Sequence, residues 1–429
     1  MSAGPFEDGF AGIPGEWIWD AEDFPVPLSP AQTGLLRLLP LRHRVVGGYL
    51  FRRVDDAEVA SDRGGIMDVV RPCKRVEAAR SLGDALGPFL DLQAEHRKLA
   101  ARGARDGQAL IDWIDTNAPD ARAQAIAVLS AQPSHDRRLS EVARGTLELG
   151  EYLELYGGFS FAWDAAAPTY AEDASSLRAA LPALARRPER GSMFYGHWVP
   201  ESALARAGGF PSPERDPDQA IAARISEAGL SSFVAEHIDQ WRARAQAKMR
   251  RLLLDLGERI GLAAPEDVFF LDDDAGRLAA LDRAPAGGAR RAAEARELQR
   301  QQRSVVPPRR MIGGRIAEAT ILGAMRGLGT GGRARGTVVR LDRTGAIERL
   351  CAAATPVVLV APTLVAGQTF AVGLAAGLVV AHGGWLGRAA RLAREAGIPA
   401  VVGASGSLDL DEGSDVVVDA DAGKVERVA

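Results

Sequence analysis

The segment SMFYGHWVPES places one titratable imidazole, His197, between the aromatic side chains of Tyr195 and Trp198. Histidine can donate or accept a proton near neutral pH, so His197 is a candidate general acid or base. Aromatic walls with a few polar groups are typical of pockets for small molecules, which makes Tyr195 and Trp198 candidate substrate contacts. The alternative is a half-buried structural histidine among aromatic residues.

A second aromatic segment, EWIWDAEDFPVPLSP, lies near the N-terminus. Its residues Trp17, Trp19 and Phe24 are further candidate substrate contacts, and Asp20 is a candidate catalytic carboxylate. Two alternatives stay open. Both tryptophans can belong to the core, and Asp20 and Asp23 can cap turns beside the prolines.

The stretch VVAHGGWLGRAARLAREAGIPAVVG predicts a strand, a Gly383-Gly384 turn, a helix from about Leu386 to Ala396 and a second strand. It puts Trp385, a candidate substrate contact, and Arg388, a candidate catalytic cation, at the helix start. A cation there opposes the helix dipole at a cost of about 0.3–1 kcal/mol unless an anion is nearby. Arg388 therefore either makes a surface or domain-contact salt bridge or binds a carboxylate or phosphate of a ligand.

This stretch resembles the mobile phosphohistidine domain of phosphoenolpyruvate synthase, pyruvate phosphate dikinase and rifampicin phosphotransferase. In that family two variable residues, a Ser or Cys, and the phosphoryl-carrying His follow the paired glycines. Here Gly387 and Arg388 occupy the last two places. A guanidinium stays protonated and has no free lone pair, so the resemblance implies that phosphoryl transfer by the family mechanism is lost. His382, six residues upstream of Arg388, is not expected to replace the carrier.

The resemblance extends over nearly the whole chain, through EWIWDAEDFPVPLSP and through MRRLLLDLGERIGLAAPEDVFFLDDDAGRL, where a helix should end before an Asp-Val-Phe-Phe-Leu strand. It implies an α+β multidomain protein. A mostly α-helical substrate-type domain is expected over residues 1–312, with an Arg-rich linker at 283–312. A swivelling β/α phosphohistidine-like domain is expected over 313–429.

Two departures from the family bear on function. No segment resembles the ATP-grasp domain that precedes the helical region in relatives. The Tyr-Gly-His-Arg motif of their helical domain aligns with Tyr156, Gly157, Gly158 and Phe159, so both of its ionisable residues are replaced.

Local patterns predict the remaining elements. The Pro-rich residues 1–30 favour an extended segment over a helix, and RHRVVGGYLFRR predicts a strand pair turning at Gly47-Gly48. Apolar spacing is helical from about 76 to 280. From about 326 onward, Val-rich runs and Gly turns predict strands, with a hairpin turn at DADAGKV. Glycines 327, 329 and 332 have dinucleotide-fingerprint spacing, but the strand expected after them argues against that site.

Composition excludes several classes. The chain has 429 residues and a formal net charge of −4, with no long basic run to bind nucleic acid. We expect no membrane span, because no apolar run is long enough, and a cytoplasmic location, because no signal peptide is seen. Cys73 and Cys351 lack metal-ligand spacing, and no HExxH motif or Walker-type loop is seen, so no metal or other cofactor is expected.

Three functions remain open. The first is an enzyme acting on a small organic molecule without ATP, such as a cyclase, dehydratase or isomerase of a biosynthetic pathway. The second is a non-catalytic binding or regulatory protein. The third is the substrate and mobile-domain subunit of a split phosphotransferase with a separate ATP-grasp chain. The sequence leaves the substrate and the oligomeric state open.

Overall fold

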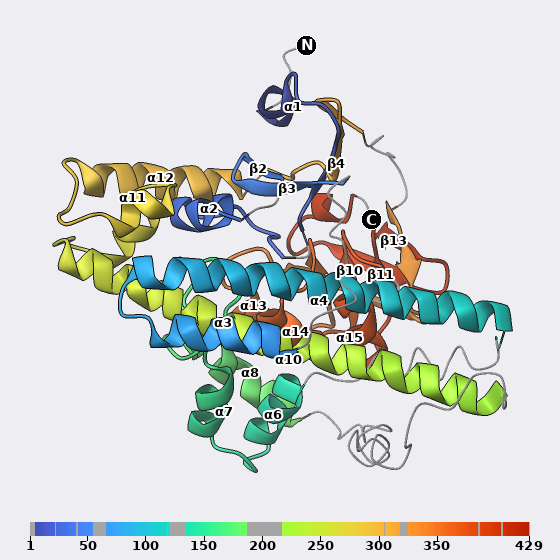
Figure 1. The fold of residues 1–429 in the computed structure, drawn as a ribbon. Coiled ribbons are helices and arrows are strands. Elements are labelled where there is room, and N and C mark those ends of the chain that lie inside the picture. Colours follow the sequence, from blue (N-terminus) through green and yellow to red (C-terminus); the bar gives the residue numbers. More distant parts are fainter. Residues whose placement is uncertain are drawn as a thin grey trace.

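The computed structural model describes the chain except residues 1–4, 22, 40–41, 55–65, 118, 120–133, 187–216, 304, 318–324, 385–386, 405 and 429. Its content is mixed helix and sheet, as expected. Helices dominate before residue 303, and most strands follow residue 325 (Figure 1).

Three helices form the main helical layer: α3 (Ile66–Ala78), α4 (Leu82–Asn117) and α10 (Pro217–Arg259). They pack along one another, and the two longest run side by side (Figure 1). The apolar spacing recognised in the sequence supplies the contact, since Leu92 and Leu99 of α4 and Leu252 and Leu256 of α10 are buried.

The shorter helical elements confirm one sequence prediction and correct another. Residues 139–155 are two helices, α6 (Ser134–Ala143) and α7 (Leu149–Tyr156), with α8 (Ser175–Ala185) following. The predicted Asp-Val-Phe-Phe-Leu strand is instead the 3-10 helix η2 (Pro265–Phe270). Its residues 267–270 are buried in succession, the element packs against α10, α2 and α12, and no described strand pairs with it. The sequence 121–129, also predicted helical, lies outside the described residues.

The N-terminal region differs from the expected extended segment. It contains α1 (Pro5–Phe10), β1 (Glu16–Trp19) and α2 (Pro30–Arg37). Pro5 and Pro30 each occupy the first helical position, where the missing N–H is not needed, and Ser29 caps α2 by accepting the Gln32 N–H. The predicted strand pair is confirmed as β2 (His43–Val46) and β3 (Tyr49–Arg53), turning at two glycines of positive φ.

These strands form a five-stranded sheet in the order β2-β3-β1-β4-β5. Its last two members, β4 (Arg310–Ile312) and β5 (Arg315–Ile316), come from the end of the Arg-rich segment. Before them lie α11 (Ala275–Ala279) and α12 (Gly288–Gln302), the latter packed against η2. The Arg-rich segment is therefore largely structured and returns to pair with the N-terminus.

The last hundred residues form an eight-stranded sheet in the order β6-β13-β12-β8-β9-β10-β11-β7. Strands β8 to β11 run parallel, and their Val-rich runs are buried, as parallel strands require. The predicted Val-rich strands and the final hairpin are all present. The strands are β6 (Met325–Arg326), β7 (Leu328–Gly329), β8 (Arg333–Arg340), β9 (Val357–Ala361), β10 (Gly377–Val380), β11 (Ala400–Val402), β12 (Asp415–Asp419) and β13 (Lys424–Arg427).

Five short helical elements accompany this sheet. They are α13 (Ala346–Ala352), η3 (Ala366–Gln368), α14 (Thr369–Val372), α15 (Arg388–Ala396) and η4 (Ser407–Asp409). Helix α15 is the helix predicted after the paired glycines. Gly327 and Gly329 lie in or beside short strands, and they are followed by the strand β8. A dinucleotide-binding fingerprint would instead be followed by a helix.

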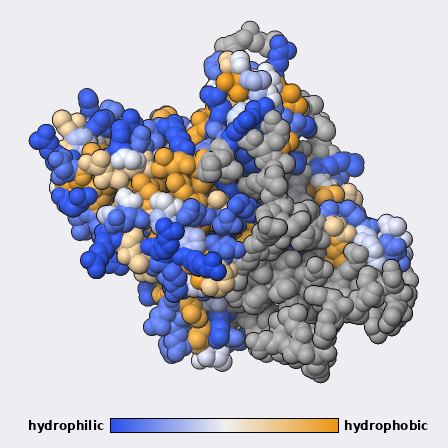
Figure 2. All heavy atoms as spheres, viewed as in Figure 1, coloured by the Kyte–Doolittle hydropathy of each residue, from blue (hydrophilic) through white to orange (hydrophobic). Residues whose placement is uncertain are grey.

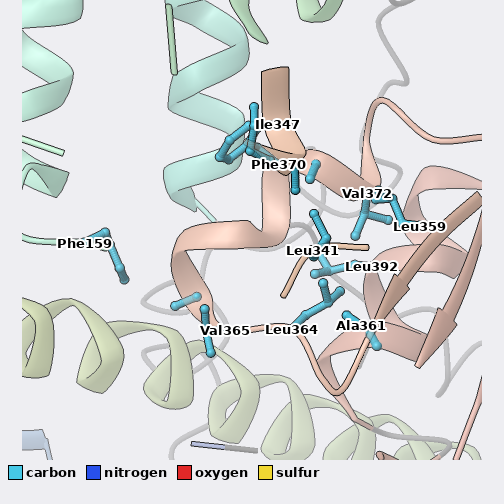
Figure 3. Close-up of a cluster of buried hydrophobic side chains, with 14 of the residues drawn as sticks. Phe159, Leu341, Ile347, Leu359, Ala361, Leu364, Val365, Phe370, Val372 and Leu392 are labelled. Carbon is cyan, nitrogen blue, oxygen red and sulfur yellow. The ribbon is translucent and has the colours of Figure 1, made fainter. Parts of the chain in front are cut away.

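One apolar core joins the helical region to the C-terminal sheet. Buried residues of the short helices, including Leu139 and Leu177, pack in the same cluster as sheet residues such as Leu359. Figure 3 shows that side chains from segment 364–372 fill much of this cluster. At its edge the Phe161 and Phe370 rings lie 6.4 Å apart. The C-terminal sheet is thus docked on the helices through apolar as well as polar contacts.

The backbone of Gly367 is central to this docking. A Cβ at this position would penetrate the carbonyl oxygen of Ser160, and the Tyr170 hydroxyl donates to the Gly367 carbonyl. We expect Gly367→Ala to lower the free energy of unfolding by about 1–3 kcal/mol, the range for overpacking a tight contact. Gly150→Ala is the matched control, because a Cβ there meets open space. Urea denaturation measures both, and equal stabilities would contradict the close approach.

The face seen in Figure 2 carries hydrophilic residues over much of its described part, with hydrophobic residues between them. Within the described residues, none of the helices is long and apolar enough to cross a membrane.

Candidate functional site

Several predicted site residues lie outside the described part of the chain. Tyr195, His197 and Trp198 fall in residues 187–216, and Trp385 falls in the pair 385–386. Their roles remain predictions. The other predicted site residues, Asp20, Arg388 and the three N-terminal aromatics, are described.

The N-terminal aromatic residues are buried. The Trp17 ring packs 5.7 Å from Phe10, and its indole N–H donates to the Pro14 carbonyl at 3.2 Å. Trp19 donates to the Phe24 carbonyl at 3.1 Å and meets the His382 ring edge-on at 4.6 Å. These contacts match the core interpretation of both tryptophans. Burial and the charge of Arg309 lower the pKa of His382 to about 3, so its ring is neutral at physiological pH.

Arg388 is the first residue of α15, directly after the cap residue Gly387. Its guanidinium pairs with Asp239 of α10 and donates to the Leu364 carbonyl at 3.2 Å. The carboxylate also supplies the anion that offsets a cation at a helix start. Of the two interpretations given to Arg388, the structure contains the domain-contact salt bridge.

Asp239 is shared by a second partner. One of its oxygens lies 2.9 Å from Nε2 of His96 on α4, while the other meets Arg388. Burial raises the pKa of Asp239, but the charge of Arg388 and the bond from His96 more than offset this and leave the pKa below its ordinary value. Asp239 is therefore an ionised acceptor, and His96 presents Nε2–H to it.

Two more carboxylates of the N-terminal turn reach the same helices. Arg97 of α4 lies 3.3 Å from Asp20, and Arg242 of α10 lies 2.7 Å from Asp23. Burial raises the pKa of Asp20 above its ordinary value, and the charge of Arg97 offsets only part of this. Burial acts likewise on Asp23, but the charges of Arg242 and its neighbours, together with the hydrogen bond from Arg242, outweigh it and lower the pKa.

We refer to these seven side chains as the charged cluster: Asp20, Asp23, His96, Arg97, Asp239, Arg242 and Arg388. In this cluster three carboxyl groups face three guanidinium groups and one imidazole. Arg242 is the most enclosed member, with its guanidinium 4.4 Å from the Trp163 ring and 5.7 Å from Phe24.

Some polar atoms beside the ion pairs lack a partner among the described residues. They are Oε1 of Gln93, Nδ1 of His96 and Nε of Arg242, all buried. Gln93 and His96 are three residues apart on α4, and so share one face of that helix. A buried polar atom without a bond is costly, which marks this region as one built to meet further polar groups.

Sequence reasoning found Asp20, Asp23 and Arg388 but missed His96 and Asp239. Both sit within ordinary helical patterning, 143 positions apart. The available signal was a polar triplet, Gln93, His96 and Arg97, on a face of α4 that also carries Leu92 and Leu99. Such a triplet on a buried face requires partners, although it does not identify them.

The positions aligned with the Tyr-Gly-His-Arg motif also lie near α10. Tyr156 and Phe159 are buried in the shared core, and a Cβ on Gly158 would lie 3.0 Å from the Ala243 carbonyl oxygen. The resemblance would put a His and an Arg at positions 158 and 159. Here the backbone of Gly158 instead lies close to that of Ala243. Among described residues, no group of three His, Cys, Asp or Glu side chains is arranged to hold a metal ion.

Comparison with known proteins bears on the C-terminal part. Residues 353–423 match the family model described as the mobile domain of PEP-utilising enzymes. This chain resembles the PEP-utilising enzyme family. The matched mobile domain contains the paired glycines, α15 and Arg388, and so includes the position from which the charged cluster is contacted.

The chain is also similar to uncharacterized proteins of mycobacteria. Uncharacterized protein Rv2047c of Mycobacterium tuberculosis and uncharacterized protein Mb2073c of Mycobacterium bovis are each 36% identical to it over 192 residues. The match covers 42% of this chain and 21% of each relative. The matched segment therefore spans only about a fifth of the length of each relative. Neither relative's name assigns an activity.

Proposed function

We propose that this chain has lost phosphoryl transfer by the family mechanism and acts, without ATP, on a small organic molecule by acid–base chemistry at the charged cluster. The observation that carries the proposal is the His96–Asp239 pair. Asp239 holds one ring nitrogen of a buried imidazole, while the other nitrogen has no partner among described residues. A base oriented by a carboxylate is a recurring arrangement in proton-transfer enzymes.

The roles follow from protonation states. Because Asp239 is ionised and accepts from Nε2–H, the neutral form of the His96 ring carries its lone pair on Nδ1, where it can accept a substrate proton. Asp20, whose pKa is raised, is the candidate acid that returns a proton. Paired proton transfers of this kind serve isomerases, dehydratases and cyclases, and they require no cofactor.

Arg388 connects this chemistry to the mobile domain. In the described arrangement Arg388 forms an ion pair with Asp239. Separation of this pair would expose the charged cluster and leave the Arg388 guanidinium available to bind a carboxylate or phosphate. We propose the aromatic residues Tyr195, Trp198 and Trp385 as substrate contacts and retain His197 as a second candidate acid or base. The layout of a helical substrate-type domain to residue 312 followed by the mobile domain belongs to the same proposal.

The loss of phosphoryl transfer is tested directly. Incubated with ATP or phosphoenolpyruvate, the chain is expected to show no mass increase of one phosphoryl group in intact-mass analysis under alkaline conditions that preserve phosphohistidine. Arg388 has no lone pair with which to accept the group. The double variant Gly387→Ser, Arg388→His should also remain unmodified, because no phosphoryl donor site has been restored. Phosphorylation of the wild-type chain would rule out the proposal.

A gene-deletion strain tests whether the chain acts on a small organic molecule. The proposal expects one small organic compound to accumulate and a related compound to disappear, with both changes reversed by the wild-type chain. The accumulated compound is then the probe for turnover in vitro without nucleotide. Unchanged metabolite levels would favour a binding or regulatory role instead.

A further inference from the structure

A second site lies apart from the charged cluster. A cavity of about 570 Å³ is lined by Val306, Arg340, Arg343, Arg349, Leu408, Asp409, Leu410, Asp411 and Glu412. Its volume falls in the range of small-molecule pockets. None of these residues belongs to the charged cluster, and none was singled out by sequence reasoning.

The cavity lies where the fold favours ligands. Arg340 ends β8, and η4 follows β11, so both walls lie beyond the carboxyl ends of parallel strands. Ligands of open α/β sheets bind in crevices at this edge. Val306, an exposed residue of the segment before β4, adds an apolar side chain to the lining.

Two arginines of the cavity are fixed by neighbouring acids. Asp342 holds Arg340 through two contacts, at 3.0 and 2.7 Å. Glu412 accepts from Nε of Arg349 at 2.8 Å, and the Thr344 carbonyl accepts from its Nη1 at 2.7 Å. These bonds leave Nη2 of Arg349 buried and without a partner among the described residues. The guanidinium is thus oriented with one donor unused.

Unpaired charges of both signs complete the lining. The side chain of Arg343 makes no hydrogen bond or ion pair with another described residue, and the same holds for the carboxylates of the exposed residues Asp409 and Asp411. A purely anionic ligand would meet the two free carboxylates. A purely cationic one would meet the free guanidinium and the unused donor of Arg349. A ligand with both charges satisfies both walls.

We propose that this cavity binds a small zwitterionic organic molecule of the amino-acid type. Its carboxylate pairs with Arg343 and Nη2 of Arg349, its ammonium group lies at Asp409 and Asp411, and its carbon chain packs on Val306 and Leu408. Guanidinium–carboxylate pairing is strong and directional, so the arginines set the orientation of the ligand. The proposal is independent of any reaction at the charged cluster.

The test uses the full chain and a series of ω-amino carboxylates: glycine, β-alanine, 4-aminobutyrate and 6-aminohexanoate. Binding is measured by isothermal titration calorimetry and by saturation-transfer NMR. The controls carry one charge each. Acetate, propionate, butyrate and hexanoate have the same carboxylate without the ammonium group, and alkylammonium ions of equal length have the ammonium group without the carboxylate. We expect one zwitterion to bind about 10- to 100-fold more tightly than either matched ion, the effect of one added charge-assisted hydrogen bond.

Variants locate the site. Arg343→Ala and Asp409→Asn should each weaken binding of the preferred zwitterion about tenfold or more. Their thermal unfolding midpoints should be unchanged, since neither side chain has a described partner to lose. Arg333→Ala is the matched control, because Arg333 is an exposed arginine of β8 outside the cavity. Equal binding by the matched ions, no binding by any member of the series, or equal affinity of the Arg343 and Arg333 variants would overturn the proposal.

Discussion

Replacement of Asp239 by alanine is expected to lower the free energy of unfolding by about 3 kcal/mol, the low end of the range for removing one partner of a buried ion pair. Among the described residues, the Asp239 carboxylate is the ion-pair partner of Arg388 and also lies against the His96 ring. The substitution leaves a mostly buried guanidinium facing an apolar side chain. Equilibrium urea denaturation gives the value, with the slope checked for two-state behaviour.

Two variants identify the origin of this loss. Asp255→Ala removes an exposed carboxylate from the same helix and should change stability by no more than about 0.5 kcal/mol. A double-mutant cycle with Arg388→Ala should give a coupling energy of about 0.5–3 kcal/mol, because the residues are in contact. Additive losses would show that Asp239 and Arg388 do not interact in solution, and the docked position of the mobile domain would need revision.

The same pair predicts a dependence on pH. The folded pKa of Asp239 lies below its ordinary value, so its contribution is complete above the unfolded pKa of about 4 and is lost as pH falls through the folded value. The stability difference between wild type and Asp239→Ala should therefore shrink below about pH 4. A difference that grew on acidification would mean that the carboxylate is not held in its ionised form.

Local sequence signals predicted the C-terminal sheet well. Strands such as β9 and β12 are short Val-rich runs; β9 is buried along its whole length, whereas β12 alternates between buried and more exposed residues. The strand at residues 267–271, which the family resemblance implied, was wrong, because this segment is a 3-10 helix. Val268 and Phe269 have strand propensity, but they are buried, their 3-10 helix packs against several helices, and none of the described strands pairs with them. Tertiary packing overrode propensity there.

The candidate site could be predicted only in part, because its pairs join distant segments. Asp20 and Arg388 were conspicuous, one beside prolines and aromatics and the other in place of a carrier residue. His96 and Asp239 meet only because α4 and α10 pack in one register, which local patterns do not specify. The Arg-rich segment shows the same limit, since its composition gives no sign that β4 pairs with β1.

The largest expected effect concerns His96. His96→Gln should lower turnover of the compound that accumulates in the deletion strain by about 10²–10⁴-fold, the usual contribution of a general acid or base. A glutamine amide can still donate to Asp239, so the ion pair with Arg388 and the fold should persist. It cannot accept and release a proton, so the proposed base is removed while the hydrogen bond is kept.

Affinity separates an enzyme from a binding protein. His96→Gln should leave the dissociation constant for the accumulated compound within a few fold, measured by calorimetry, whereas Arg388→Ala should weaken it by about 1–3 kcal/mol if the guanidinium binds the ligand's anionic group. Arg388→Lys should restore only part, because an ammonium lacks the planar fork. Lys98→Gln, next to the cluster on α4 but half-exposed, is the control and should match wild type. Wild-type turnover in His96→Gln would exclude the imidazole as the base, and Asp20 and His197 would become the next candidates.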